Sequence, residues 1–138
     1  MTKHRKTFKQ KQPDPNRPGQ WIYNVQGCPV LPYRLPEVME AIAAGHRILV
    51  FEGEGKVDLA WSWNVPATCN AGGAGKWTKE HAEYLREADV VVLGDADDAG
   101  RSHVRVVGTS LKDIAKSVCV LDLPGLGPKE DIRDWAAE

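Results

Sequence analysis

Four short runs of mostly apolar residues recur along the chain, and a polar, helix-like segment follows each of them. The runs are RILVFE (47–52), PATCN (66–70), DVVVLGD (89–95) and SVCVLDL (117–123). Continuous apolar runs of this length are typical of strands that are buried on both faces of a parallel sheet. The segments between them favour helices over 55–63, 78–88, 100–116 and 125–138. This alternation predicts a Rossmann-like α/β fold, with a four-stranded, mainly parallel sheet flanked by helices.

The first 45 residues follow a different pattern. WIYNVQGCPVLPYRL contains two short β-type runs separated by Gln26-Gly27, which predicts an N-terminal β-hairpin extension. A helix is predicted between Pro36, at a first helical position, and Gly45, at a C-terminal cap. Before Trp21 the chain is basic and rich in turn-forming residues. We therefore divide the chain into a basic flexible tail (1–20), a hairpin and helix extension (21–45) and a main domain (46–138).

Composition narrows the class of protein only slightly. With 138 residues, 42% of them hydrophobic, the chain is long enough to bury one core. The net charge of −1 indicates no overall basic field for binding nucleic acid. The basic tail has two interpretations, a disordered segment or an arm that contacts nucleic-acid phosphates. The three cysteines lack the spacing of a zinc site. No apolar run has the length of a membrane span or a secretory signal, and we expect a cytoplasmic protein.

Acidic residues follow the predicted strands. Glu52 ends the first strand, Asp95 ends the third, Asp97 lies in the next loop, and Asp131 lies beyond the fourth. In a parallel sheet, functional residues gather at the carboxyl ends of the strands. If the first and third strands are neighbours, Glu52 faces Asp95 and Asp97. Clustered carboxylates either take up protons or hold a cation, and oxygen ligands without His or Cys favour Mg²⁺.

Two other motifs fail when their spacing is checked. GDADDAGRS resembles a calcium-binding EF-hand loop, but Ala99 and Val106 occupy positions five and twelve, where ligands are needed. NAGGAGKW resembles a Walker phosphate loop, but Asn70 stands in place of the first glycine and Trp77 in place of Ser or Thr. This glycine-rich segment stays open to two interpretations, a tight turn or a loop that contacts substrate.

The segments VFEGEGKVD, DVVVLGDADDAGR and LGPKEDIRDW together resemble the Toprim domain of bacterial primases, topoisomerases and related nucleases. The family has a glutamate at the end of its first strand and a D-x-D pair at the end of its third, which here are Glu52 and Asp95 with Asp97. The resemblance spans residues 46–135. YRLPEV, EGE, GDADDAGR and KEDIRDW are similar to Toprim segments of primases from phages and mobile elements.

The resemblance implies a Mg²⁺-dependent nucleotidyl transferase, with Mn²⁺ as a substitute metal, that acts on single-stranded DNA and nucleotides. It implies Glu52, Asp95 and Asp97 as catalytic residues and metal ligands, and Asp131 as a further metal ligand. It also implies a zinc-binding or helicase module, in a longer chain or as a partner. The chain departs from the primase pattern at Lys56, where primases often carry an acid. A Toprim nuclease and a non-catalytic Toprim module that binds DNA or protein remain alternatives.

Basic residues near the predicted site are candidates for binding nucleic-acid phosphates. Lys56 follows the first strand, Lys76 follows the glycine-rich loop, and Arg101 lies near the start of a helix. Each has a simpler interpretation. Surface lysines commonly contact only solvent, and Arg101 could pair with the neighbouring acids instead of a phosphate.

Overall fold

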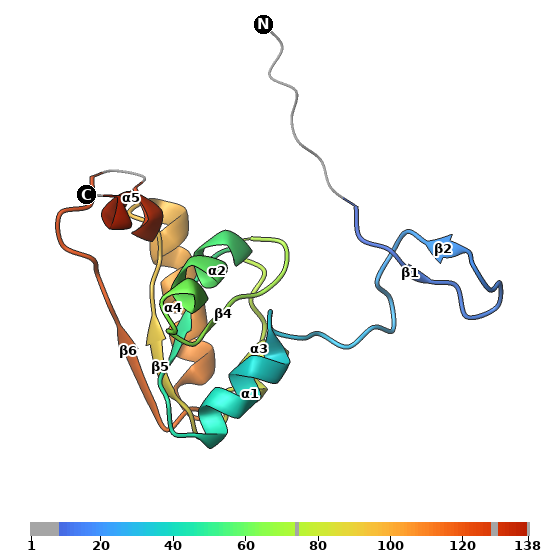
Figure 1. The fold of residues 1–138 in the computed structure, drawn as a ribbon, viewed down its shortest axis with the longest axis horizontal. Helices are drawn as coiled ribbons and strands as arrows, with labels where there is room; N and C mark the ends of the chain where they lie inside the picture. The colour runs from blue at the N-terminus through green and yellow to red at the C-terminus, as the bar shows by residue number, and fades with distance from the viewer. Residues whose placement is uncertain (1–8, 74, 128–129, 138) are drawn as a thin grey trace, which may run out of the picture.

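The computed structural model describes residues 9–73, 75–127 and 130–137. It confirms an α/β fold, in which helices flank a four-stranded parallel sheet and a separate antiparallel hairpin extends from it (Figure 1). The strands of the sheet are β3 (Ile48–Val50), β4 (Ala67–Thr68), β5 (Asp89–Val92) and β6 (Ser117–Val120). The helices are α1 (Leu35–Ala43), α2 (Glu54–Ser62), α3 (Lys79–Glu83), α4 (Asp98–Leu111) and α5 (Ile132–Ala136).

The strand order β4-β3-β5-β6 places a switch point between β3 and β5. After β3 the chain moves outward to β4, and it then returns to form β5 on the other side of β3. The pair is parallel, with Val50 opposite Val92. The first and third strands of the sequence pattern are therefore neighbours, which is the condition under which Glu52 was expected to face Asp95 and Asp97. The residues that follow these strands leave the sheet at the same edge, where α/β proteins bind their ligands.

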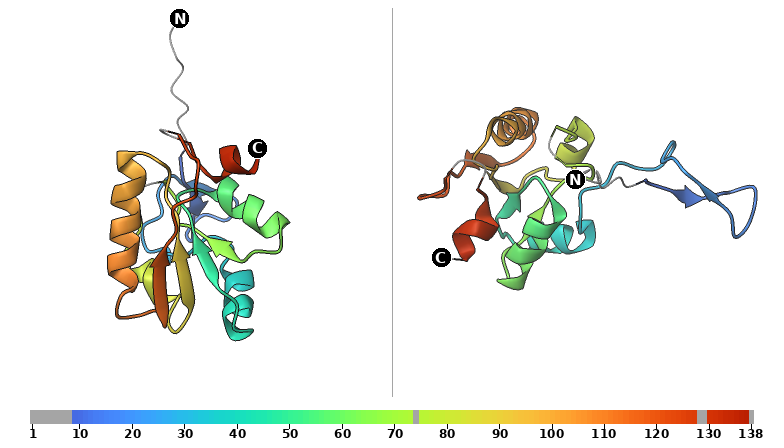
Figure 2. Two further views of the ribbon diagram at one scale, coloured as in Figure 1. Left: turned by 90° about the vertical axis from the view of Figure 1, so that its left-hand side faces the viewer. Right: turned by 90° about the horizontal axis from the view of Figure 1, so that it is seen from above.

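Side chains alternate between two apolar layers, one on each face of the sheet. Figure 2 shows α3 and α4 on one side of the sheet and α2 and α5 on the other. Ile48, Val50 and Val90 pack on the face covered by α1, α3 and α4. Phe51 and Leu93 pack on the opposite face, which α2 and α5 cover. Burial on both faces explains the almost uninterrupted apolar sequences of β3 and β5. The same expectation is wrong for β6 at the edge of the sheet, which is largely exposed although its sequence is apolar. The two layers hold the ends of β3 and β5 in place.

Helix α1 ends as its sequence predicts. The Gly45 N–H donates to the Ile42 carbonyl and the His46 N–H to the Ala41 carbonyl, both at 3.0 Å. Gly45 has a φ of 79°, in the left-handed region that glycine adopts without strain. The chain then turns directly into β3. This short connection fixes where β3 begins.

Three of the predicted helices are shorter in the structure. Helix α3 covers five residues instead of the whole of 78–88, because the chain tightens after it and Glu87 takes a φ of 63°. Helix α4 begins at Asp98, before Gly100, and ends at Leu111. Helix α5 begins at Ile132, and part of the predicted segment 125–138 lies outside the described residues.

An N-terminal antiparallel hairpin is present, but the predicted one, within residues 21–35 and with its turn at Gln26-Gly27, is wrong. Strand β1 (Gln12–Pro13) pairs with β2 (Trp21–Ile22), so the turn is at residues 14–20 and not at Gln26-Gly27. Asp14 holds this turn, because its carboxylate accepts the Asn16 N–H at 2.9 Å and pairs with Arg17. Part of the predicted flexible tail is thus in the hairpin, while its first eight residues lie outside the described residues. No helix in the described ranges is long and apolar enough to cross a membrane.

Candidate active site at the carboxyl edge of the sheet

Glu52 lies directly beyond β3 and is almost completely buried, with 8% of its surface exposed. One of its oxygens accepts the backbone N–H of Asp95 at 3.4 Å. Burial, and next the hydrogen bond and charge of the nearby Asp95 carboxyl, raise the pKa of Glu52 to about 7. A carboxyl group with such a pKa can take up or release a proton near neutral pH.

Asp95 reaches the same place from β5, through a connection that depends on two glycines. A side chain on Gly94 would collide with Gly100 and Val104 of α4, and a side chain on Gly100 would collide with the backbone of Asp95. Without side chains at these positions, the first turn of α4 packs directly against the end of β5. The glycines of DVVVLGDADDAGR therefore determine where Asp95 lies.

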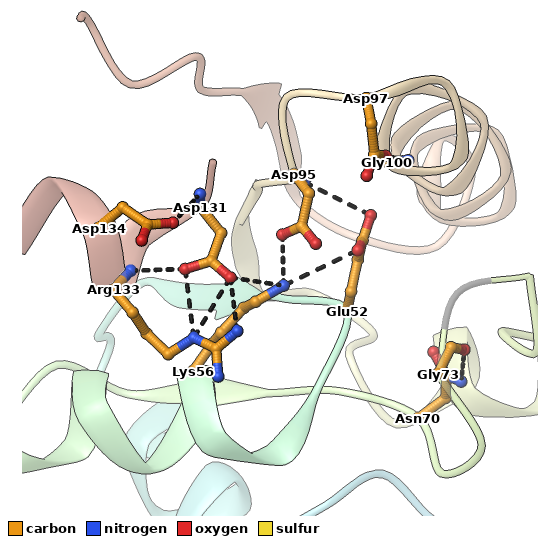
Figure 3. Close-up of polar contacts among 10 residues, drawn as sticks. All are labelled: Glu52, Lys56, Asn70, Gly73, Asp95, Asp97, Gly100, Asp131, Arg133 and Asp134. Carbon is orange, nitrogen blue, oxygen red and sulfur yellow. Dashed lines mark hydrogen bonds and ion pairs between the residues drawn. The ribbon is translucent and has the colours of Figure 1, made fainter. Parts of the chain in front are cut away.

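Asp97 caps helix α4, and its carboxylate lies against the first turn of the helix (Figure 3). Its Oδ1 accepts the Gly100 N–H at 2.6 Å. Asp98 is fully exposed and pairs with Arg101 on the surface. The structure thus brings Asp97 to the edge of the site, where it also caps α4. Arg101 pairs with its helical neighbour and not with Glu52 or Asp95.

Lys56 occupies the centre of the acidic cluster (Figure 3). Its ammonium group forms a hydrogen-bonded ion pair with Oδ1 of Asp95, and lies 3.8 Å from Oε2 of Glu52 and 3.7 Å from Oδ2 of Asp131. Only 7% of the residue is exposed. The interpretation of Lys56 as a surface lysine is therefore wrong. A buried ammonium among three carboxylates is the main electrostatic feature of this site.

Asp131 is brought to the cluster by α5 and is held by Arg133. It caps the helix, accepting the Arg133 N–H at 2.7 Å, and it binds the Arg133 guanidinium at 2.7 Å. The hydrogen bonds from Arg133, more than any other contact, lower the pKa of Asp131. The sequence reasoning missed Arg133. Asp131 and Asp134 have the spacing of a capping box, a signal that would have placed Arg133 in the first helical turn beside the acids.

A cavity of about 240 Å³ opens beside the cluster, lined by Glu52, Gly53, Gly55, Lys56, Gly73 and Arg133. The glycine-rich loop thus forms one wall of this cavity. Asn70 holds the loop, because its side-chain amide donates to the carbonyls of Ala71 and Gly73 at 2.9 and 2.8 Å. Exposed Lys76 lies against Gly72 in the same loop. Of the two interpretations of this loop, contact with substrate gains support from its position.

The chemistry of the cluster fits a hard cation, since the converging ligands are all carboxylate oxygens. In the structure, Glu52, Asp95 and Asp131 surround the ammonium group of Lys56. Among the described residues, no three Asp, Glu, His or Cys side chains are grouped so as to hold a metal ion. Asp95 has a second oxygen beyond the one that Lys56 binds, and Asp97 has one beyond its capping bond. These oxygens and the Glu52 carboxylate are the groups that would have to hold a hard cation here.

Comparison of the chain with protein-family models, curated proteins and solved structures found no match. The Toprim resemblance consequently depends on the residues of this chain. The structure contributes the arrangement of those residues, which is an acidic cluster at the switch point of a parallel sheet.

Proposed function

We propose that this protein is a Toprim-type, Mg²⁺-dependent nucleotidyl transferase, which extends or starts nucleic-acid strands in the manner of a phage or mobile-element primase. One observation carries the proposal. Glu52 and Asp95 follow neighbouring parallel strands, and the Asp95 N–H donates to the Glu52 carboxylate at the switch point. The resemblance assigns catalysis to these same two residues and Asp97.

The reaction would join a 3′-hydroxyl oxygen to the α-phosphorus of a nucleoside triphosphate. The bond from that phosphorus to the pyrophosphate oxygen breaks, and the hydroxyl proton moves to Glu52. A pKa of about 7 suits Glu52 for accepting this proton at neutral pH. Mg²⁺, when bound, supplies charge neutralisation on the phosphates. Asp95 and Asp97 would hold it.

The cavity beside the cluster supports a phosphorylated substrate. Gly53, Gly55 and Gly73 line it, so a phosphate could approach the backbone closely there. Arg133 is on its rim with an exposed side chain, and Lys76 is in the glycine-rich loop nearby. In this proposal, these two residues contact substrate phosphates, while the basic tail contacts the single-stranded template.

The test is a synthesis assay with the purified chain, single-stranded DNA, ribonucleotides and Mg²⁺ or Mn²⁺. Asp95→Asn should abolish the formation of oligonucleotides, because it weakens the metal site without changing the shape of the residue. The matched control is Asp98→Asn, which alters an exposed aspartate three positions away and should retain activity. Equal activity of wild type and Asp95→Asn would refute the catalytic assignment.

The same assay separates the alternatives. Cutting of the DNA that depends on Asp95 would identify the nuclease, in which water replaces the 3′-hydroxyl as the attacking group. Binding of DNA by wild type and Asp95→Asn alike, with neither synthesis nor cutting, would identify the non-catalytic module. The ion pair between Lys56 and Asp95 is the observation that favours this last alternative.

A further inference from the structure

Lys56 uses one oxygen from each of three carboxylates. It pairs with Oδ1 of Asp95 and lies within 4 Å of Oε2 of Glu52 and Oδ2 of Asp131. These three residues come from the end of β3, the end of β5 and the start of α5. The ammonium group therefore lies where a cation would contact carboxylates from all three segments.

The position of Lys56 is fixed by the fold and does not depend on a flexible surface side chain. Lys56 is in the first turn of α2, one turn after Glu52, and its neighbour Val57 is completely buried in the core. The side chain is itself only 9% exposed. A lysine anchored in this way keeps its ammonium group among the three carboxylates.

Three carboxylates at this end of the sheet each have an oxygen that makes no contact with Lys56. Asp95 has its Oδ2, Glu52 has the Oε1 that faces the Asp95 backbone, and Asp97 has its Oδ2. Mg²⁺ and Mn²⁺ are commonly bound in proteins by one or two carboxylates, with water or substrate as further ligands. In the proposed site, these oxygens would be the protein ligands of one such ion.

The net charge of the cluster also favours one bound divalent ion. When ionised, it has four carboxylates and two basic groups, which are Glu52, Asp95, Asp97, Asp131, Lys56 and Arg133. The net charge is then −2, which a single divalent cation neutralises. A second divalent ion would make the substrate-free site strongly positive, at a high electrostatic cost in a partly buried place.

We infer that Lys56 takes the place of one metal ion in this site, so that the protein binds one divalent cation where a site without the lysine would bind two. Lys56 is thus a positioning residue, which holds Asp95 and Asp131 together and supplies the second positive charge. This inference rests on the proposed function, because it takes Asp95 and Asp97 as metal ligands.

The test counts Mn²⁺ ions on the full chain by titration calorimetry and electron paramagnetic resonance at pH 8, without nucleotide. Wild type should bind one ion, with the spectrum of an isolated Mn²⁺. Lys56→Met should bind two, with the broadened spectrum of a close pair, and its first ion should bind about tenfold more tightly because a like charge is gone. Lys56→Arg retains the charge and should bind one ion. Lys112→Met, which alters an exposed lysine on α4, should behave as wild type.

Two ions on wild type would overturn the inference, and this result needs no variant to fold. One ion on wild type and one on folded Lys56→Met, with equal affinity, would overturn it while the proposed function stands. No ion on wild type but one on Lys56→Met would also overturn it, since Lys56 would then exclude the metal. If neither protein binds Mn²⁺, the proposed metal site fails as well. Asp95→Asn distinguishes these cases, because it should lose the wild-type ion only if Asp95 is a ligand.

Discussion

Replacement of Glu52 by glutamine should stabilise the protein at alkaline pH and leave its stability unchanged at acidic pH. Burial raises the pKa of Glu52 from 4.5 to about 7, so the folded protein favours the protonated carboxyl. In the unfolded chain the same group ionises near its ordinary value. The folded state therefore holds an additional proton between these two values, and the free energy of unfolding of wild type falls as the pH rises from about 4.5 to 7.

The size of the effect follows from this difference in pKa. It corresponds to at most about 3.5 kcal/mol at pH 8, since each pKa unit corresponds to about 1.4 kcal/mol. For a domain of this length, that is a rise in melting temperature of at most roughly 7–14 °C for Glu52→Gln. Glutamine has the shape of the protonated carboxyl, and Lys56 still has Asp95 and Asp131 as partners.

Thermal melts in chelator at pH 8 and at pH 4.5 would test this expectation. The two proteins should differ at pH 8 and melt together at pH 4.5. Glu40→Gln, which alters an exposed glutamate on α1, should match wild type at both values. A Glu52→Gln protein that is less stable than wild type at pH 8, or equally shifted at both pH values, would refute the reasoning from burial.

Three further predictions follow from the same site. Gly100→Ala should lower the free energy of unfolding in urea by roughly 2–4 kcal/mol, because the new methyl group meets the backbone of Asp95. The control Gly108→Ala lies in the same helix with open space around it, and it should raise the free energy of unfolding by about 0.5–1 kcal/mol. Arg133→Met should cost about 0.5–1 kcal/mol at pH 7, a modest value because the side chain is 61% exposed. The difference between Arg133→Met and wild type should vanish in urea unfolding near pH 2. Because the pKa of Asp131 is lowered in the folded state, its ionised carboxylate stabilises the protein above the ordinary pKa of aspartate, and this stability is lost as the pH falls through the pKa of the folded state. Mn²⁺ affinity should rise between pH 6 and 8 in wild type and change less in Glu52→Gln, since the ion displaces a proton from a carboxyl whose pKa is about 7. Calorimetry at several pH values measures this, and an equal dependence of affinity on pH in the two proteins would contradict the prediction.

The sheet could be predicted from the sequence because burial on both faces leaves a clear record in it. In β5, every valine of DVVVLGD is buried, which is why its apolar run is uninterrupted. The position of Glu52 relative to Asp95 also followed, once β3 and β5 were taken as neighbours. The hairpin was harder to predict. Its strands have two residues each, too few for a periodic pattern, and the turn around Asp14 is determined by side-chain hydrogen bonds.

The part of the site that could not be predicted is the part that depends on three separate segments meeting. Lys56 is adjacent to buried Val57 in the sequence, but a helical pattern does not distinguish a buried lysine from an exposed one that extends to solvent. Its burial becomes favourable only when Asp95 and Asp131 arrive from β5 and α5. An isolated lysine there would lose its hydration without compensation, and the three carboxylates without it would repel one another. Three of the carboxylates for which the Toprim resemblance implies metal binding, Glu52, Asp95 and Asp131, therefore already surround the ammonium group of Lys56, and any divalent ion would have to bind beside that group or displace it.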